Sequence, residues 1–249
     1  MIYFLCKGSV RMNKKHTDQY QKLTDQMQSL SRNASLNLKM TCQNNTEKGM
    51  IGNYLYEYVN DAYKSIETIC KCLNDDALAQ ACMLIRPLIE SVATIKVLME
   101  NPDVMEMFTE LYIIRRRLNG KDGFNKAVKI LFEDELESSD NILNFISYGW
   151  VKSLSDDGKY DIEKIISLAG FDELKHWRNL SSSYLHLGYT SKEVEKNDLK
   201  FEVLDLVARM TKELESICTD KYAVFDVDSI RKEYNDFNQK FSIVSKIEK

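Results

Sequence analysis

The sequence is poor in the two residue types that make tight turns. Its 249 residues include 9 glycines and 2 prolines, roughly a third of the usual share of these types. The hairpins of β-sandwiches and β-barrels depend on such residues, so the composition argues against these folds. Hydrophobic residues make up 44% of the chain, enough for a substantial core. We expect an all-α fold.

The chain also lacks a strong excess of either charge. It has 34 basic and 38 acidic residues and a formal net charge of −4. No basic field of the whole protein would attract nucleic acid. An anionic partner must therefore be bound by a local patch.

Long apolar segments are missing too. The opening MIYFLCKGSVR is apolar for only about five residues, shorter than a signal-peptide core or a membrane span. The six cysteines lack the regular spacing of a secreted disulfide framework. We expect a cytoplasmic protein with no membrane partner, in which residues 1–11 reflect an upstream start and form a frayed end.

Signatures of metal and cofactor sites are absent from the sequence. Cys70 and Cys72 are two apart on a predicted helix, so they point about 200° from each other. The three histidines are scattered at positions 16, 176 and 186. There is no phosphate-binding loop, nucleophile elbow or dinucleotide fingerprint. We therefore expect no metal and no cofactor.

Apolar residues recur every three or four positions along most of the chain, as in amphipathic helices. Residues 76–100 are the most hydrophobic stretch and are expected at the centre, with Pro87 in the helix interior. Asn74, Asp75 and Asp76 should cap its start, and Asn101 with Pro102 should begin the next helix.

The predicted helices cover about 17–38, 51–73, 76–100, 102–118, 124–137, 139–154, 160–169, 172–188, 191–218 and 226–246. A loop is expected at 41–49, and the domain division is 1–48 as tail and helical extension and 49–249 as one helical domain.

Two charged residues stand out in the most apolar helix. Arg86 and Glu90 are four positions apart and can meet side by side. Because an unpaired buried charge is very costly, we expect the pair to have a partner in the 178–186 segment. Two interpretations remain: an internal ion pair that fixes helix packing, or a polar cleft that orients a ligand.

The second unusual segment is a serine-rich helix. Asn179, Ser182, Ser183 and His186 recur at i, i+3, i+4 and i+7 and form a polar stripe, with Arg178 at its edge. Histidine titrates near neutral pH, and arginine forms a bidentate fork for phosphate. The stripe could therefore bind phosphate and move a proton, or be an ordinary surface face.

Arg178-Asn179 followed by His186 near a helix end resembles the arginine–polar–histidine signature of the HEPN superfamily. IRPLIESVATIKVL at 85–98 and WRNLSSSYLHLG at 177–188 are also similar to a related bacterial helical family of unknown function, with Arg-x-x-x-Glu and Leu-Ser-…-His motifs. The resemblance spans roughly residues 50–215. It implies a HEPN-like helical bundle with additional N- and C-terminal helices.

The resemblance further implies a metal-independent endoribonuclease or toxin of a bacterial defence or stress system. A homodimer would cut RNA through attack by the RNA's own 2′-hydroxyl. His186 would be the acid/base and Arg178 would stabilise phosphate charge, with Asn179 and Ser183 orienting them. Ser182, Arg86 and Glu90 would support the site.

Two alternatives stay open. The same cleft could belong to a non-catalytic module that binds a nucleotide or a regulatory protein partner. Arg86, Glu90 and His186 could instead form a buried polar network that specifies helix register.

Overall fold

The computed structural model describes residues 14–44, 50–117, 141–187 and 193–222, with positions 125, 128, 129, 132 and 134–137. This part of the chain contains helices and no strand, which confirms the expected all-α class. The α-helices are α1 (Lys14–Asn44), α2 (Met50–Asn74), α3 (Leu78–Glu100), α4 (Met105–Arg117), α6 (Ile142–Tyr148), α7 (Ile162–Leu168), α8 (Lys175–Leu187) and α9 (Glu193–Tyr222). Three 3-10 helices are η1 (Pro102–Val104), η2 (Gly149–Leu154) and η3 (Asp172–Leu174).

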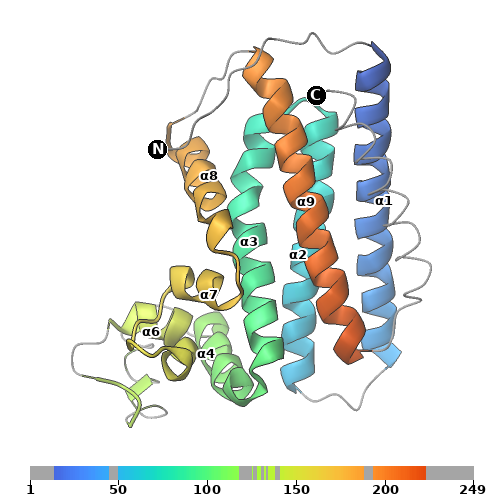
Figure 1. Ribbon diagram of the computed structural model, residues 1–249. Coiled ribbons are helices and arrows are strands. Elements are labelled where there is room, and N and C mark those ends of the chain that lie inside the picture. The colour runs from blue at the N-terminus through green and yellow to red at the C-terminus, as the bar shows by residue number, and fades with distance from the viewer. Residues whose placement is uncertain are drawn as a thin grey trace.

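The four longest helices, α1, α2, α3 and α9, lie side by side as a bundle (Figure 1). The shorter helices α4, α6, α7 and α8 gather along the flank of α3. Helix α3 packs against α2, α7, α8 and α9. It is thus the element that joins the long bundle to the short helices.

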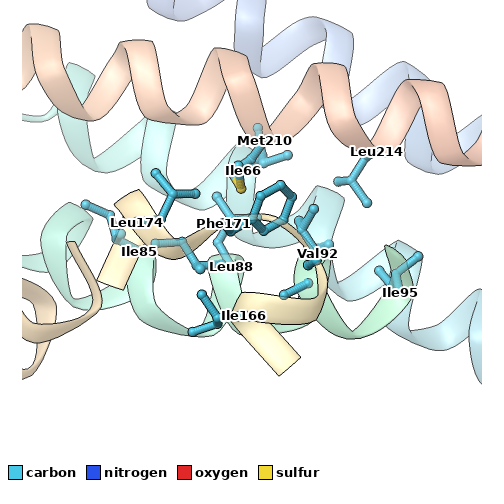
Figure 2. Close-up of a cluster of buried hydrophobic side chains, with 14 of the residues drawn as sticks. Ile66, Ile85, Leu88, Val92, Ile95, Ile166, Phe171, Leu174, Met210 and Leu214 are labelled. Atoms are coloured by element: carbon cyan, nitrogen blue, oxygen red, sulfur yellow. The ribbon is translucent and has the colours of Figure 1, made fainter. Parts of the chain in front are cut away.

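The central position of α3 follows from its composition. Between residues 92 and 99 every side chain except that of Lys96 is buried, as expected for a helix that is hydrophobic on every face. Figure 2 shows Ile85, Leu88 and Ile95 of α3 among core side chains from other parts of the chain, including Met210 of α9 and Phe171, which lies between α7 and η3. Arg86 and Glu90 lie on the side of α8, whereas Lys96 pairs with Glu213 of α9.

The structure corrects the predicted caps of α3. Its N-cap is Ala77, which makes no side-chain cap bond. Asp76 instead has a φ of +59°, and the amides of Asp76 and Ala77 donate to the carbonyls of Leu73 and Cys72. This is a Schellman motif that ends α2.

The next helical segment begins as predicted, with Asn101 at the N-cap position of η1 and Pro102 in its first turn. The Asn101 side chain makes no cap bond to η1 and instead donates to the carbonyl of Val97 in α3. One helix end differs from the prediction. Helix α1 continues through Asn44, although 41–49 was expected as a loop. Residues 41–44 contain no glycine or proline, so nothing in them breaks a helix.

A glycine turn connects α7 to the segment that carries the serine-rich helix. Gly170 has a φ of +72°, and the amides of Gly170 and Phe171 donate to the carbonyls of Ser167 and Ile166. Another Schellman motif therefore ends α7. It sends Phe171 into the core and brings α8 back along α3.

The predicted helices at 124–137 and 226–246 fall largely or wholly outside the described residues, as do residues 1–11. In the described part, no helix is both long and apolar enough to span a membrane.

Replacing Leu88 with alanine should lower the free energy of unfolding by about 2–5 kcal/mol, because it leaves a cavity in the core. Leu88 is fully buried, whereas Leu36 on α1 is 52% exposed. Leu36→Ala is the matched control and should change stability by less than about 0.5 kcal/mol. Chemical denaturation measures both values, and equal effects would show that Leu88 is not central.

Candidate functional site

The candidate site begins at the proline inside α3. Pro87 has no amide hydrogen, so it cannot donate to the carbonyl of Met83 as the helix requires. The hydroxyl of Ser181 on α8 donates to this carbonyl at 3.2 Å, and the Arg86 amide donates to the same hydroxyl at 3.3 Å. Ser181 is buried. A side chain of α8 thus occupies the gap that Pro87 leaves in the bonding of α3.

One turn further along α3, two arginines share one carboxylate oxygen. Nε of Arg86 and Nε of Arg178 both donate to Oε1 of Glu90, each at 2.8 Å. The Arg178 side chain is 15% exposed and that of Glu90 is 24% exposed. The predicted i, i+4 pair is present, and its predicted partner in the 178–186 segment is Arg178. We call Arg86, Glu90 and Arg178 the arginine cluster.

Polar groups on both sides extend the arginine cluster. NH1 of Arg86 donates to the Ser182 hydroxyl at 3.2 Å, and this hydroxyl donates to the carbonyl of Arg178 at 3.1 Å. NH1 of Arg178 lies 3.7 Å from Oε1 of Glu163 on α7. Ser182 therefore joins the cluster, as its place in the predicted stripe suggests. Asn179, by contrast, is exposed.

The other predicted site residues cannot be placed relative to this cluster. The backbone of Ser183 and His186 belongs to α8, but their side chains lie outside the described part of the structure. On a regular helix, Arg178 and His186 are about 12 Å apart along the axis. Their catalytic roles stay predictions.

A cavity of about 190 Å³ adjoins the arginine cluster and has Glu90 in its wall. Tyr148 and Arg115 also line it. Burial raises the pKa of the Tyr148 hydroxyl, and so does the negative charge of Glu90, while Arg115, Arg178 and Arg86 act in the opposite direction. Tyr148 is therefore protonated and neutral at physiological pH and can donate a hydrogen bond.

Sequence reasoning did not identify Glu163, Tyr148 or Arg115 as site residues. Glu163 opens α7, Tyr148 ends α6 and Arg115 lies in the last turn of α4. None has a spacing relation to Arg86 or Arg178 that a periodic pattern could reveal. Only the packing of α7 on α3 and of α4 on α6 brings them together.

Among the described residues, no group of three or more histidine, cysteine, aspartate or glutamate side chains is arranged to hold a metal ion.

Comparison with known proteins indicates no family for this chain, so its function is inferred from the geometry of the site. No family model matches the chain, and neither a curated protein nor a solved structure matches it. The resemblance to the HEPN superfamily stays a prediction.

Removing the Ser181 hydroxyl should destabilise the protein by about 1–3 kcal/mol, because the part-buried Met83 carbonyl then loses its donor. The measurement is the free energy of unfolding of Ser181→Ala. Ser65→Ala is the control: Ser65 also donates to a backbone carbonyl, that of Asp61, but the bond is solvent-exposed. Its effect should stay within about 0.5 kcal/mol, and a similar loss in both variants would contradict the role given to Ser181.

A double-mutant cycle should detect the contact between Glu90 and Arg178. With Glu90→Gln and Arg178→Met, we expect a coupling energy above about 0.5 kcal/mol in unfolding experiments, because the two groups touch and are mostly covered. The exposed pair Asp61 and Lys64, 3.8 Å apart, provides the comparison and should couple more weakly. Additive effects of the Glu90 and Arg178 changes would refute the contact.

Proposed function

We propose that the arginine cluster binds the phosphate groups of RNA and that the protein cuts RNA without a metal ion. The observation that carries this proposal is the shared oxygen: Oε1 of Glu90 accepts from both Arg86 and Arg178. One carboxylate balances one guanidinium, so the cluster keeps a positive charge. Glu163 compensates this positive charge only weakly, because its side chain is 62% exposed and its Oε1 lies 3.7 Å from NH1 of Arg178.

The way in which the arginines are held suits an anionic ligand. Each guanidinium is fixed through its Nε, and an arginine has further N–H donors on its terminal nitrogens. A fixed guanidinium loses little freedom when it binds phosphate and presents a planar fork to it. Glu90 therefore acts as a positioning residue for both arginines.

The proposed reaction uses proton transfer and charge stabilisation only. A base takes the proton from the 2′-hydroxyl, and the 2′-oxygen attacks the neighbouring phosphorus. The bond from phosphorus to the 5′-oxygen breaks, and an acid gives that oxygen a proton, leaving a 2′,3′-cyclic phosphate and a 5′-hydroxyl. The resemblance assigns the proton transfers to His186 and the stabilisation of phosphate charge to Arg178.

Two copies of the chain belong to this proposal. Arg178 and His186 of one α8 are about 12 Å apart along the helix axis. In a homodimer, Arg178 of one copy can act with His186 of the other.

A second function uses the same surface without cleavage. Arg178 is largely covered and already contacts two carboxylates, and a cavity adjoins Glu90. These observations favour a regulatory module that binds a nucleotide. Binding of RNA or nucleotide without product formation would identify this function.

The test is cleavage of a labelled, unstructured RNA by the purified protein in the presence of a chelator. We expect fragments that end in 2′,3′-cyclic phosphate, and a loss of about 10²–10⁴-fold in rate for His186→Ala, because the proton carrier is gone. Arg178→Ala should lose activity as well, and Arg178→Lys should recover only part of it. Circular dichroism checks that each variant remains helical.

Matched controls come from the same protein. His176 lies in the first turns of α8, is exposed and has its Nδ1 2.5 Å from the Glu173 carbonyl; His176→Ala should keep full activity. Arg32 on α1 pairs with Glu67, and Arg32→Ala should also be active. No cleavage by the wild type, or equal cleavage by His186→Ala and His176→Ala, would overturn the ribonuclease proposal.

A further inference from the structure

The cavity beside the arginine cluster has a composition that points to a ligand. Its volume is about 190 Å³, and side chains from α2, α3, α4, α6, α7 and η2 line it. A cavity of roughly 150 Å³ is large enough for a benzene ring. This cavity therefore accommodates a single substituted ring.

Aromatic side chains form much of the wall. Tyr58, Phe108, Tyr148 and Trp150 all line the cavity. The rings of Tyr58 and Trp150 each pack edge to face on Phe108, at centroid distances of 5.5 and 5.4 Å. Flat rings stack on such side chains, and nucleobases gain affinity in this way.

Several polar groups in the same wall have no protein partner. Within the described part of the chain, the hydroxyls of Tyr58, Ser91 and Tyr148 form no hydrogen bond. Burial raises the pKa of Tyr58, so this hydroxyl is a neutral donor. All three residues are half-buried, so their hydroxyls remain available to a molecule that enters the cavity. Three such hydroxyls in one small cavity are suited to a ligand that carries its own acceptors.

The charged groups at the cavity indicate which charge and which hydrogen-bond donors a ligand should carry. Arg115 is exposed, lines the cavity and forms no ion pair with any described residue. Glu90 uses Oε1 for both of its arginine donors, and no described residue donates to its Oε2. A matching ligand carries a negative group for Arg115 and an N–H donor for Glu90.

We infer that this cavity binds the base of a cytidine nucleotide, with the 4-amino group on Oε2 of Glu90 and the phosphate near Arg115. Cytosine is a single ring, has one exocyclic amino donor, and offers a ring nitrogen and a carbonyl as acceptors for the hydroxyls. Carboxylates recognise cytosine through this amino group. Uracil has the same shape but presents a carbonyl oxygen there, which Glu90 repels.

This inference deepens the proposed function and rests on it, because the cavity and the arginine cluster share Glu90. The nucleotide is either a residue of a bound RNA strand or a free mononucleotide. In the first case, the cavity makes the protein select cytidine next to the phosphate that the cluster holds.

Equilibrium binding of cytidine 5′-monophosphate to the full-length protein is the test, followed by tryptophan fluorescence because Trp150 lines the cavity. We expect quenching, and binding at least about tenfold tighter than that of uridine 5′-monophosphate. Calorimetry measures the same affinities without relying on Trp150. Ribose 5-phosphate, which has no base, should bind far more weakly than either nucleotide.

Arg115→Gln tests the contribution of the ligand's phosphate charge separately from that of its base. It should weaken binding of the monophosphate about tenfold or more but leave the affinity for uncharged cytidine unchanged. Arg32→Gln on α1 is the control and should change neither affinity, because Arg32 is bonded to Glu67 on α2. Tyr148→Phe removes one hydroxyl and should weaken binding of both cytidine and its monophosphate.

Two further measurements identify the source of the ligand and keep the proposals apart. A 2′-O-methyl oligocytidine cannot be cleaved and can therefore be used as a competitor. If it competes with cytidine 5′-monophosphate, the ligand is a residue of an RNA strand. If it does not compete, the ligand is a free mononucleotide. Nucleotide binding and RNA cleavage are measured separately, so a failure of cleavage leaves this inference intact. Absence of binding, equal affinity for the cytidine and uridine nucleotides, or no effect of Arg115→Gln would overturn it, even if the protein cleaves RNA.

Discussion

The bond between Ser181 and the Met83 carbonyl holds together the part of the molecule from which the site is built. Pro87 removes one backbone donor from the most buried helix of the protein, and a carbonyl without a donor in the interior is costly. Since α8 supplies the missing donor, the two helices are fixed in register at this point. Register at Ser181 in turn brings Arg178, three residues earlier, to Glu90, and Ser182 to Arg86.

That register explains how charges are tolerated at the edge of an apolar core. Arg86 and Glu90 alone would form a neutral pair, but the approach of α8 adds a second arginine to the same carboxylate oxygen. The cluster is only partly covered, with the Arg86 side chain 35% exposed, so solvent compensates some of the excess charge. An anion at this position would compensate it better, since charge-assisted hydrogen bonds to a guanidinium are strong.

From the sequence, this site can be predicted only as far as the spacing of nearby residues indicates it. Arg86 and Glu90 are an i, i+4 pair, and the cost of burying charge requires a partner for them, so contact with the 178–186 segment was predictable. The all-α class follows from composition and periodicity. The helix caps were harder: Asp76 is a good N-cap residue type, yet it occupies a left-handed position at the end of α2, because a few polar residues between two helices can serve either one.

The cavity was beyond sequence reasoning for a different reason. Arg115 lies in the last turn of α4, where a basic residue is equally well explained by the helix dipole. Tyr148 and Trp150 are part of an apolar stretch that any core helix could have. Their convergence depends on how the short helices pack, and no periodicity encodes that packing.

Glu90 connects the two parts of the site. Its Oε1 holds both arginines, while its Oε2 is free of donors from the described residues at the cavity. In the proposed complex, a donor on Oε2 would draw negative charge away from Oε1 and leave more positive charge on the two guanidiniums for phosphate. Filling the cavity would then strengthen anion binding at the arginine cluster, and by reciprocity an anion there would strengthen binding in the cavity. A single carboxylate is enough to couple the two, because both arginines and the cavity wall meet at its two oxygens.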